Sequence, residues 1–344
     1  AAAAAPDALV PKRRAWHGVA RPGATFLTMS FPTDPFPMQL MLPHQLRMLT
    51  DNRSSISRVV VIDHPAPDRP PGPHGPYLEE ARSTGSAAVS RVELGNAFDP
   101  AFLRRFFELP EGGGRGQVSA SSFVPFKGAK LTSNLFGMLH FLEQCNATDT
   151  ELCVWVDSDI FLYRRDRGLV DLAFAAFEER PDLVVLEPPR MCASRTFGTA
   201  TYGRSCDVDW MDYASSQTMV VHRPRLLSML PLPVKFEDFL GWTMGGGFEE
   251  AFSAALRRVN GIGQFLCGGS IVALHPPDDG DRGSIERTLL KLAAGATGGP
   301  GSGALSIPGF SEESVRGLQA LIQLMEAGRL NTTASAPLCW DLSI

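Results

Sequence analysis

Leu152-Cys153-Val154-Trp155-Val156-Asp157-Ser158-Asp159 is the stretch that decides the fold, because an unbroken apolar run leads directly into two carboxylates. A continuous apolar run of this length predicts a strand that is buried on both faces, as in the parallel sheet of an α/β protein. In such sheets, ligands bind at the carboxyl ends of the strands. The two acidic residues are therefore predicted to lie at the edge of the sheet where a ligand binds.

The segments around this strand alternate between strand and helix patterns. Strands are predicted at 25–31, 59–62, 87–94, 183–186, 218–222 and 270–274, and helices at 37–49, 127–143, 168–180, 248–259 and 312–325. Helices between apolar strands predict an α/β fold, with a mostly parallel sheet flanked by helices on both faces. We expect a stem or linker at 1–22, a single large domain at 23–280, and a C-terminal extension at 281–344 whose Gly-rich loop and helix pack on that domain.

Composition excludes several classes of function. The 344 residues are 44% hydrophobic and 20% charged, as in an ordinary soluble globular protein. The net charge of −5 gives no field that favours nucleic acid or an anionic membrane. No apolar run approaches the roughly 18 to 20 residues of a membrane helix, so we expect no span in this chain. The chain begins at Ala1 without Met, so we expect a processed N-terminus from which a signal or anchor has been removed.

Sequons and cysteines favour a secretory compartment. Glycosylation sequons begin at Asn52, Asn146 and Asn331. Six cysteines are an even number, and none falls in a Cys-x-x-Cys pair that would favour zinc. Disulfides between Cys145 and Cys153 and between Cys192 and Cys206 are options, but 15 pairings stay open. Scattered buried thiols of a cytosolic protein are the alternative.

The two carboxylates after the central strand are candidate metal ligands. Side chains at i and i+2 share a face of an extended segment, so Asp157 and Asp159 can point at one divalent cation. Such a cation accepts further oxygen ligands from a diphosphate. The alternative is a solvated turn, because short Asp-x-Asp strings are common. A second pair with this spacing, Asp207 and Asp209, is interpreted as surface loop.

A glycine-rich segment, 241–247, leads into the predicted helix at 248–259, whose first turn carries Glu249 and Glu250. Glycines allow a ligand to approach the backbone closely. Acids at a helix start also stabilise the helix by complementing its positive end. In the functional alternative, one of the two is a general base that faces the cleft.

Further candidates stand at the ends of other predicted elements. His275 follows the strand at 270–274 and offers a nitrogen ligand beside Asp159, which suits Mn²⁺ better than Mg²⁺. Lys130 and Asn134 begin the helix before the acidic strand and are candidates for contacting phosphate or base, with a solvated helix face as the alternative. Asp63 ends the apolar run at 59–62 and is assigned to the nucleotide site.

The order of these features resembles that of GT-A glycosyltransferases, over about residues 24 to 280. The segment from Gly245 to His275 is similar to the Gly-Gly-Glu-Asp segment of β-1,4-galactosyltransferases and to the Trp-Gly-Gly-Glu segment of polypeptide N-acetylgalactosaminyltransferases. Here the acidic pair is Glu249-Glu250 rather than Glu-Asp, and Gly247-Phe248 separates it from the double glycine. Phe236-Glu237-Asp238 is a rival acidic element that lacks the glycine-rich lead-in.

The resemblance implies a Rossmann-like GT-A fold and a function. Asp157, Asp159 and His275 would bind Mn²⁺ or Mg²⁺ together with a nucleotide-sugar donor, a UDP-sugar. The acceptor would be a glycan or glycoprotein in the Golgi, and Glu250 would be the base of an inverting reaction. Two alternatives remain: a haloacid-dehalogenase-like phosphatase with Asp157 as nucleophile, and a non-catalytic sugar-binding protein on the same fold.

Overall fold

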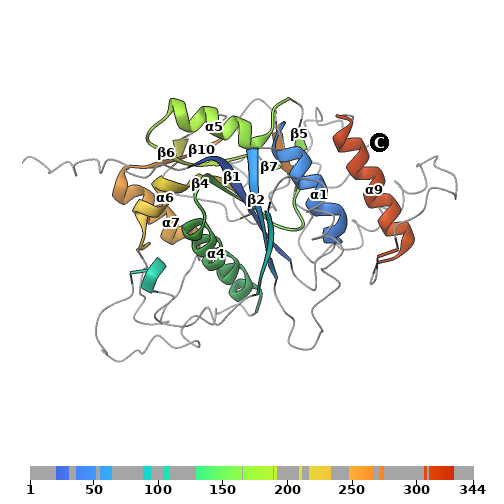
Figure 1. The fold of residues 1–344 in the computed structure, drawn as a ribbon, viewed down its shortest axis with the longest axis horizontal. Helices are drawn as coiled ribbons and strands as arrows, with labels where there is room; N and C mark the ends of the chain where they lie inside the picture. The colour runs from blue at the N-terminus through green and yellow to red at the C-terminus, as the bar shows by residue number, and fades with distance from the viewer. Residues whose placement is uncertain are drawn as a thin grey trace, which may run out of the picture.

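The computed structural model describes residues 21–30, 36–51, 55–63, 88–93, 104–108, 129–164, 166–188, 190–191, 209–210, 217–233, 248–266, 271–274, 306–307 and 310–328. These residues form an α/β fold, in which helices lie on both sides of a mixed sheet (Figure 1). The sheet is mixed, but more of its described strand pairs are parallel than antiparallel. This confirms the prediction of an α/β fold with a mostly parallel sheet flanked by helices.

The described part of the main sheet has eight strands in the order β3-β2-β1-β4-β9-β6-β10-β8. Their bounds are β1 Arg21–Ser30, β2 Ile56–Asp63, β3 Ala88–Glu93, β4 Thr150–Val156, β6 Leu183–Glu187, β8 Asp209–Trp210, β9 Thr218–His222 and β10 Ile262–Phe265. Strands β3, β2, β1 and β4 are parallel to one another, whereas β9 is antiparallel to both β4 and β6. β10 is parallel to β6, and β8 pairs with it antiparallel. β1, β2, β4 and β6 therefore all end at one edge of the sheet, which we call the carboxyl edge.

A second sheet has the order β5-β11-β7, with β5 at Phe161–Arg164, β7 at Arg190–Met191 and β11 at Ile271–Leu274. β11 is antiparallel to β5 and parallel to β7. The expectation that 270–274 is a strand of the main parallel sheet is therefore wrong. A four-residue apolar strand has the same local pattern in either sheet, and its pairing with β5 and β7 decides which sheet it joins.

The helices form two layers, one on each face of the main sheet, and alternate side chains of β4 pack against one layer or the other. α1 (Met38–Leu49), α5 (Leu169–Glu179) and α9 (Glu312–Glu326) pack in one apolar cluster with Val154 and Val156 of β4. α4 (Ala129–Ala147), α6 (Arg223–Met229) and α7 (Phe248–Val259) pack on the other side, with Cys153 and Trp155. Figure 1 shows these two groups on opposite sides of the strands. Successive residues of a strand point to opposite faces, so one apolar run serves both layers.

Most predicted elements are confirmed, with ends that differ by a few residues. Strand β1 begins at Arg21, so the last two residues of the predicted stem are strand. Asp209 lies in the short strand β8 rather than in a loop, because Asp209 and Trp210 pair with β10. The prediction missed β5, β7, β10 and α6, which have two to seven residues each.

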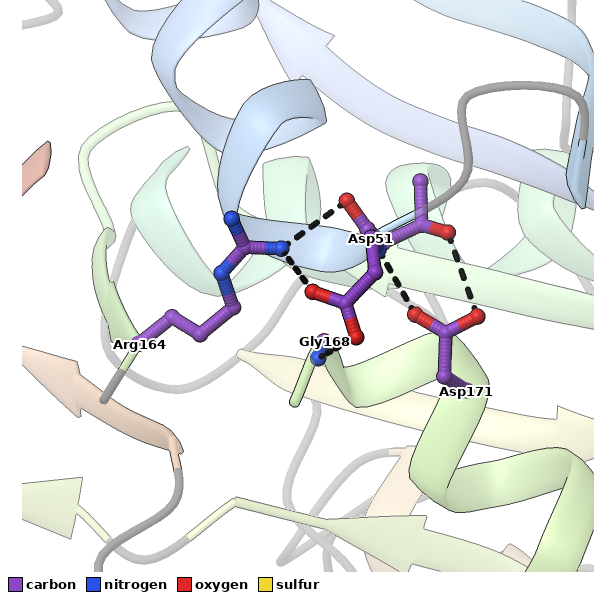
Figure 2. A network of polar contacts seen from close by, with 5 residues as sticks. Asp51, Arg164, Gly168 and Asp171 are labelled. Atoms are coloured by element: carbon purple, nitrogen blue, oxygen red, sulfur yellow. Dashed lines mark hydrogen bonds and ion pairs between the residues drawn. The ribbon is translucent and has the colours of Figure 1, made fainter. Parts of the chain in front are cut away.

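A polar network joins the end of α1 to β5 and to the start of α5 (Figure 2). Arg164 of β5 donates to the carboxylate of Asp51 and, at 3.0 Å, to the carbonyl of Thr50. The Asp51 amide donates to Asp171 of α5 at 2.7 Å, and the Gly168 amide donates to Asp51 at 3.4 Å. These contacts fix the second sheet against α1, the helix that also reaches the acidic turn described below.

The C-terminal helix α9 packs on α1 and β5, through Leu318, Leu321 and Ile322 among others. Arg47 of α1 lies 2.7 Å from Glu326 of α9 in an ion pair at the rim of this contact. Residues 295–303, where a Gly-rich loop was predicted, lie outside the described residues.

Two of the six cysteines are described, and they are neighbours. Cys145, near the end of α4, and Cys153 of β4 are both fully buried and are free thiols, not joined by a disulfide. Burial raises the pKa of the Cys145 thiol well above its usual range, and the contact with Cys153 raises it further. The structure thus brings together one of the pairs considered for a disulfide and holds it as two thiols. Asn146, the next residue and the start of a sequon, is exposed.

Candidate active site

The two acidic residues after β4 lie in a tight turn. The Ile160 amide donates to the Asp157 carbonyl at 3.1 Å, which closes a four-residue turn over Ser158 and Asp159. Ser158 is buried, whereas Asp157 and Asp159 are partly exposed. The expected extended geometry is therefore wrong, because Asp and Ser favour turns through their short polar side chains. The carboxylates occupy the first and third positions of this acidic turn, at the carboxyl edge.

Trp155 fixes the orientation of the first carboxylate. Its indole nitrogen donates to Oδ1 of Asp157 at 2.8 Å. The ring itself is buried and packs edge-on against Phe141 of α4, with centroids 5.8 Å apart. The Asp157 amide also donates to the Gln217 carbonyl at 2.8 Å, which ties the turn to the segment before β9. A charge-assisted hydrogen bond from a rigid ring therefore holds Asp157 in one orientation.

Gln45 of α1 holds the same turn from the other layer. Its Nε2 donates to the carbonyls of Asp157 and Ile160, each at 2.9 Å. These carbonyls belong to the first and last residues of the turn. Sequence reasoning missed Gln45, because a single Gln inside an amphipathic helix has no local signal that separates it from an ordinary helix residue.

Asp63 ends its strand close to the level of Asp157. Leu27 of β1 pairs with both Val60 of β2 and Trp155 of β4. Asp63 is three residues beyond Val60 and Asp157 is two beyond Trp155, so their backbones differ by one residue in level. With β1 between them, two inter-strand spacings separate the strands by about 10 Å. The backbone of Asp63 is thus at the carboxyl edge, as predicted; its side chain lies outside the described part.

The start of α4 points toward the carboxyl edge. The helix ends just before β4 begins, so it runs back along the sheet in the opposite direction to that strand. At Gly137 it approaches so closely that an added Cβ would lie 2.7 Å from Met29 and 3.2 Å from Trp155. At a rise of 1.5 Å per residue, Asn134 and Lys130 lie about 5 and about 10 Å beyond this level, toward the edge. Only their backbone positions are described.

α7 also begins toward the carboxyl edge, on the same side of the sheet as α4. It ends before β10, whose first residue, Ile262, pairs with Leu183 at the start of β6. Twelve residues of helix span about 18 Å, close to the length of a five-residue strand. The first turn, with Glu249 and Glu250, is therefore directed toward the edge. The side chains of both glutamates lie outside the described part, so the choice between them stays a prediction.

The second sheet brings the end of β11 to the acidic turn. Leu274, the last residue of β11, pairs with Phe161, which is two residues after Asp159. His275 follows Leu274 in the chain but lies outside the described residues. Within the described ranges, no three His, Cys, Asp or Glu side chains gather as a metal cluster. Asp157 and Asp159 are the two predicted ligands that these ranges include, and partly exposed carboxylates are the oxygen donors that a hard divalent cation prefers.

Glu187 is a further acidic residue at the carboxyl edge that sequence reasoning missed. It ends β6 and is fully buried. Val220 of β9 pairs with both Val154 and Leu186, so Glu187 lies at the level of Trp155, two strands away. A single Glu after an apolar run is also what the start of a surface loop looks like, and its burial follows only from the tertiary fold.

The chain matches no family model, and no curated protein matches it in sequence. Among the described helices, none combines the length and the apolar character that crossing a membrane requires.

Proposed function

We propose that this protein is a glycosyltransferase of the GT-A type, which moves a sugar from a nucleoside-diphosphate sugar, a UDP-sugar, to a hydroxyl group of a glycan or glycoprotein. One observation carries the proposal: elements that are far apart in sequence are directed to the edge of the sheet that carries the acidic turn. The end of β2, the starts of α4 and α7, and the end of β11 are all directed to the edge where Asp157 and Asp159 lie.

In this proposal, Asp157 and Asp159 hold Mn²⁺ or Mg²⁺, and His275 completes the protein ligands. The ion, when bound, neutralises the charge of the departing diphosphate as a Lewis acid. Lys130 and Asn134 at the start of α4 bind the phosphates or the base, and Asp63 binds the nucleotide. The rigid orientation of Asp157 by Trp155 fits this role, because a preoriented carboxylate loses little freedom when it binds a ligand.

Glu250 is the proposed general base, and Glu249 is the alternative. A direct displacement that inverts the anomeric centre needs a carboxylate within hydrogen-bond reach of the attacking hydroxyl, opposite the diphosphate. α7 lies in the same helix layer as α4 and brings both glutamates toward the carboxyl edge. The acidic turn lies at that edge too, at the end of β4. We further propose that the enzyme works in the secretory pathway lumen, in the Golgi, which the sequons at Asn52 and Asn146 support.

The test compares UDP-sugar turnover with hydrolysis of a phosphate monoester, each with and without Mn²⁺. Asp159→Ala should abolish UDP-sugar turnover, while Asp166→Ala, which removes an exposed carboxylate outside the turn, should leave it unchanged. Glu250→Gln should slow transfer by about 10²- to 10⁴-fold while donor still binds, and Glu249→Gln should slow it much less.

Other outcomes would replace the proposal. Phosphate-monoester hydrolysis that is lost in Asp157→Asn, without UDP-sugar turnover, would favour the phosphatase. Sugar binding without either activity would favour a non-catalytic protein. Retained anomeric configuration in the product, read by NMR, would exclude the inverting mechanism.

A further inference from the structure

We infer that Gln45 is a positioning residue of this site, which holds the acidic turn in the geometry that binds the cation and the diphosphate. The inference rests on the proposed function, because it assigns a role to Gln45 through Asp157 and Asp159. Gln45 itself lies in α1, on the opposite side of the turn from Trp155, and acts only through the backbone.

The contacts of Gln45 account for both of its amide hydrogens. Nε2 donates one hydrogen bond to the Asp157 carbonyl and one to the Ile160 carbonyl, at 2.9 Å each. The Ile160 amide donates to the same Asp157 carbonyl. One side-chain nitrogen thus bridges the two ends of the turn and fixes its opening, and with it the relative position of the two carboxylates.

Packing alone does not explain a glutamine at this position. Gln45 is fully buried, and the neighbouring buried positions of α1 include Met41, Leu42, Met48 and Leu49. Burial of a carboxamide destabilises a protein unless its polar atoms are hydrogen-bonded. Within the described residues, its Oε1 has no hydrogen-bond partner. A methionine of similar length would fill the same space without that cost, so the distinctive contribution of Gln45 is its pair of N–H donors.

The turn is therefore held from three directions. Gln45 binds its two end carbonyls, Trp155 binds the Asp157 carboxylate, and the Gln217 carbonyl accepts from the Asp157 amide. Groups that orient metal ligands from behind contribute to metal affinity, and their removal typically weakens it 10- to 100-fold. We expect an effect of about this size at Gln45, through looser placement of Asp157 and Asp159.

The experiment measures Mn²⁺ affinity, with Mn²⁺ alone and with UDP present, in the full chain. Gln45→Met removes both donors at nearly constant volume and should weaken Mn²⁺ binding by about 10- to 100-fold. Gln45→Glu keeps the size and shape and supplies at most one donor, so it should also weaken binding. The control, Met48→Ala, lies one turn along α1 in the same core and should lower the melting temperature while leaving Mn²⁺ affinity unchanged.

Hydrogen exchange at the Ile160 amide gives a readout that does not depend on metal. The exchange should be faster in Gln45→Met than in the wild type. In Met48→Ala, the exchange should change only as much as the lower global stability requires. A Gln45 variant that folds and binds Mn²⁺ with wild-type affinity would overturn this inference but not the proposed metal site. Equal weakening in Met48→Ala would reduce Gln45 to a structural role and also overturn it. A wild type that binds no Mn²⁺, with or without UDP, would overturn the metal site itself and this inference with it.

Discussion

We predict that the protein loses stability in mild acid because of the mostly buried side chain of His222. His222 ends β9, its imidazole packs edge-on against Phe177 at 5.5 Å, and its side chain is 13% exposed. The pKa of His222 is lowered from 6.5 to about 4, first because burial disfavours the imidazolium and second because the Arg225 guanidinium repels it. Glu151 lies 3.8 Å from Nε2 but does not reverse this. The imidazole is therefore neutral in the folded protein at pH 7.

The direction of the effect follows from the two pKa values. Between pH 6.5 and pH 4 the unfolded chain binds a proton at His222 and the folded chain does not, so falling pH favours unfolding. The stability that the neutral His222 imidazole allows is fully present above pH 6.5 and is lost as the pH falls toward 4. At about 1.4 kcal/mol per pH unit, the interval from pH 6.5 to pH 4 gives an upper limit of about 3.5 kcal/mol for the loss of stability due to His222. Partial exposure to solvent reduces this to roughly half, of which about 1 kcal/mol falls between pH 7.5 and pH 5.0.

The assay is urea unfolding of the wild type and of His222→Gln at pH 7.5 and pH 5.0. The buried residues His44 and His140 also have lowered pKa values, mainly through burial, but both are present in both proteins and cancel in the difference. Burial raises the pKa of Glu151, so at that residue falling pH favours the folded state, which is opposite to the effect of His222. The wild type should lose about 1 kcal/mol more than His222→Gln between the two pH values. Equal losses in the two proteins would refute the reasoning.

Two further predictions concern packing and compartment. Gly168→Ala should destabilise the fold by roughly 1–3 kcal/mol, because an added Cβ would lie 2.5 Å from backbone atoms at the end of α1, which cannot move aside as a side chain can. Thermal unfolding measures this against Gly328→Ala, where the Cβ meets no atom within 4 Å and only the φ of 65° causes strain; a smaller loss for Gly168→Ala would contradict the close approach. In protein from a eukaryotic secretory host, mass spectrometry should find glycan at a sequon, with exposed Asn146 as the first candidate. Bare asparagines together with six free thiols would argue for the cytosol.

The sequence by itself determined the class of the fold and the position of the acidic turn. The apolar run 152–156 is buried on both faces, and its carboxylates follow at the carboxyl edge, as predicted. The amphipathic helix at 248–259 was predicted with the bounds that the structure has. These features depend on local periodicity and on turn chemistry, which are properties of consecutive residues.

The tertiary structure decided which distant residues support the turn. The donation from Gln45 to Asp157 joins residues 112 positions apart, and the pairing of Leu274 with Phe161 joins residues 113 apart. Neither contact has a signal in the residues around it, and β5 and β10 are only four residues long. Strand pairing and buried hydrogen bonds are selected by the packing of the whole chain, in which each polar group takes the partner that burial brings within reach.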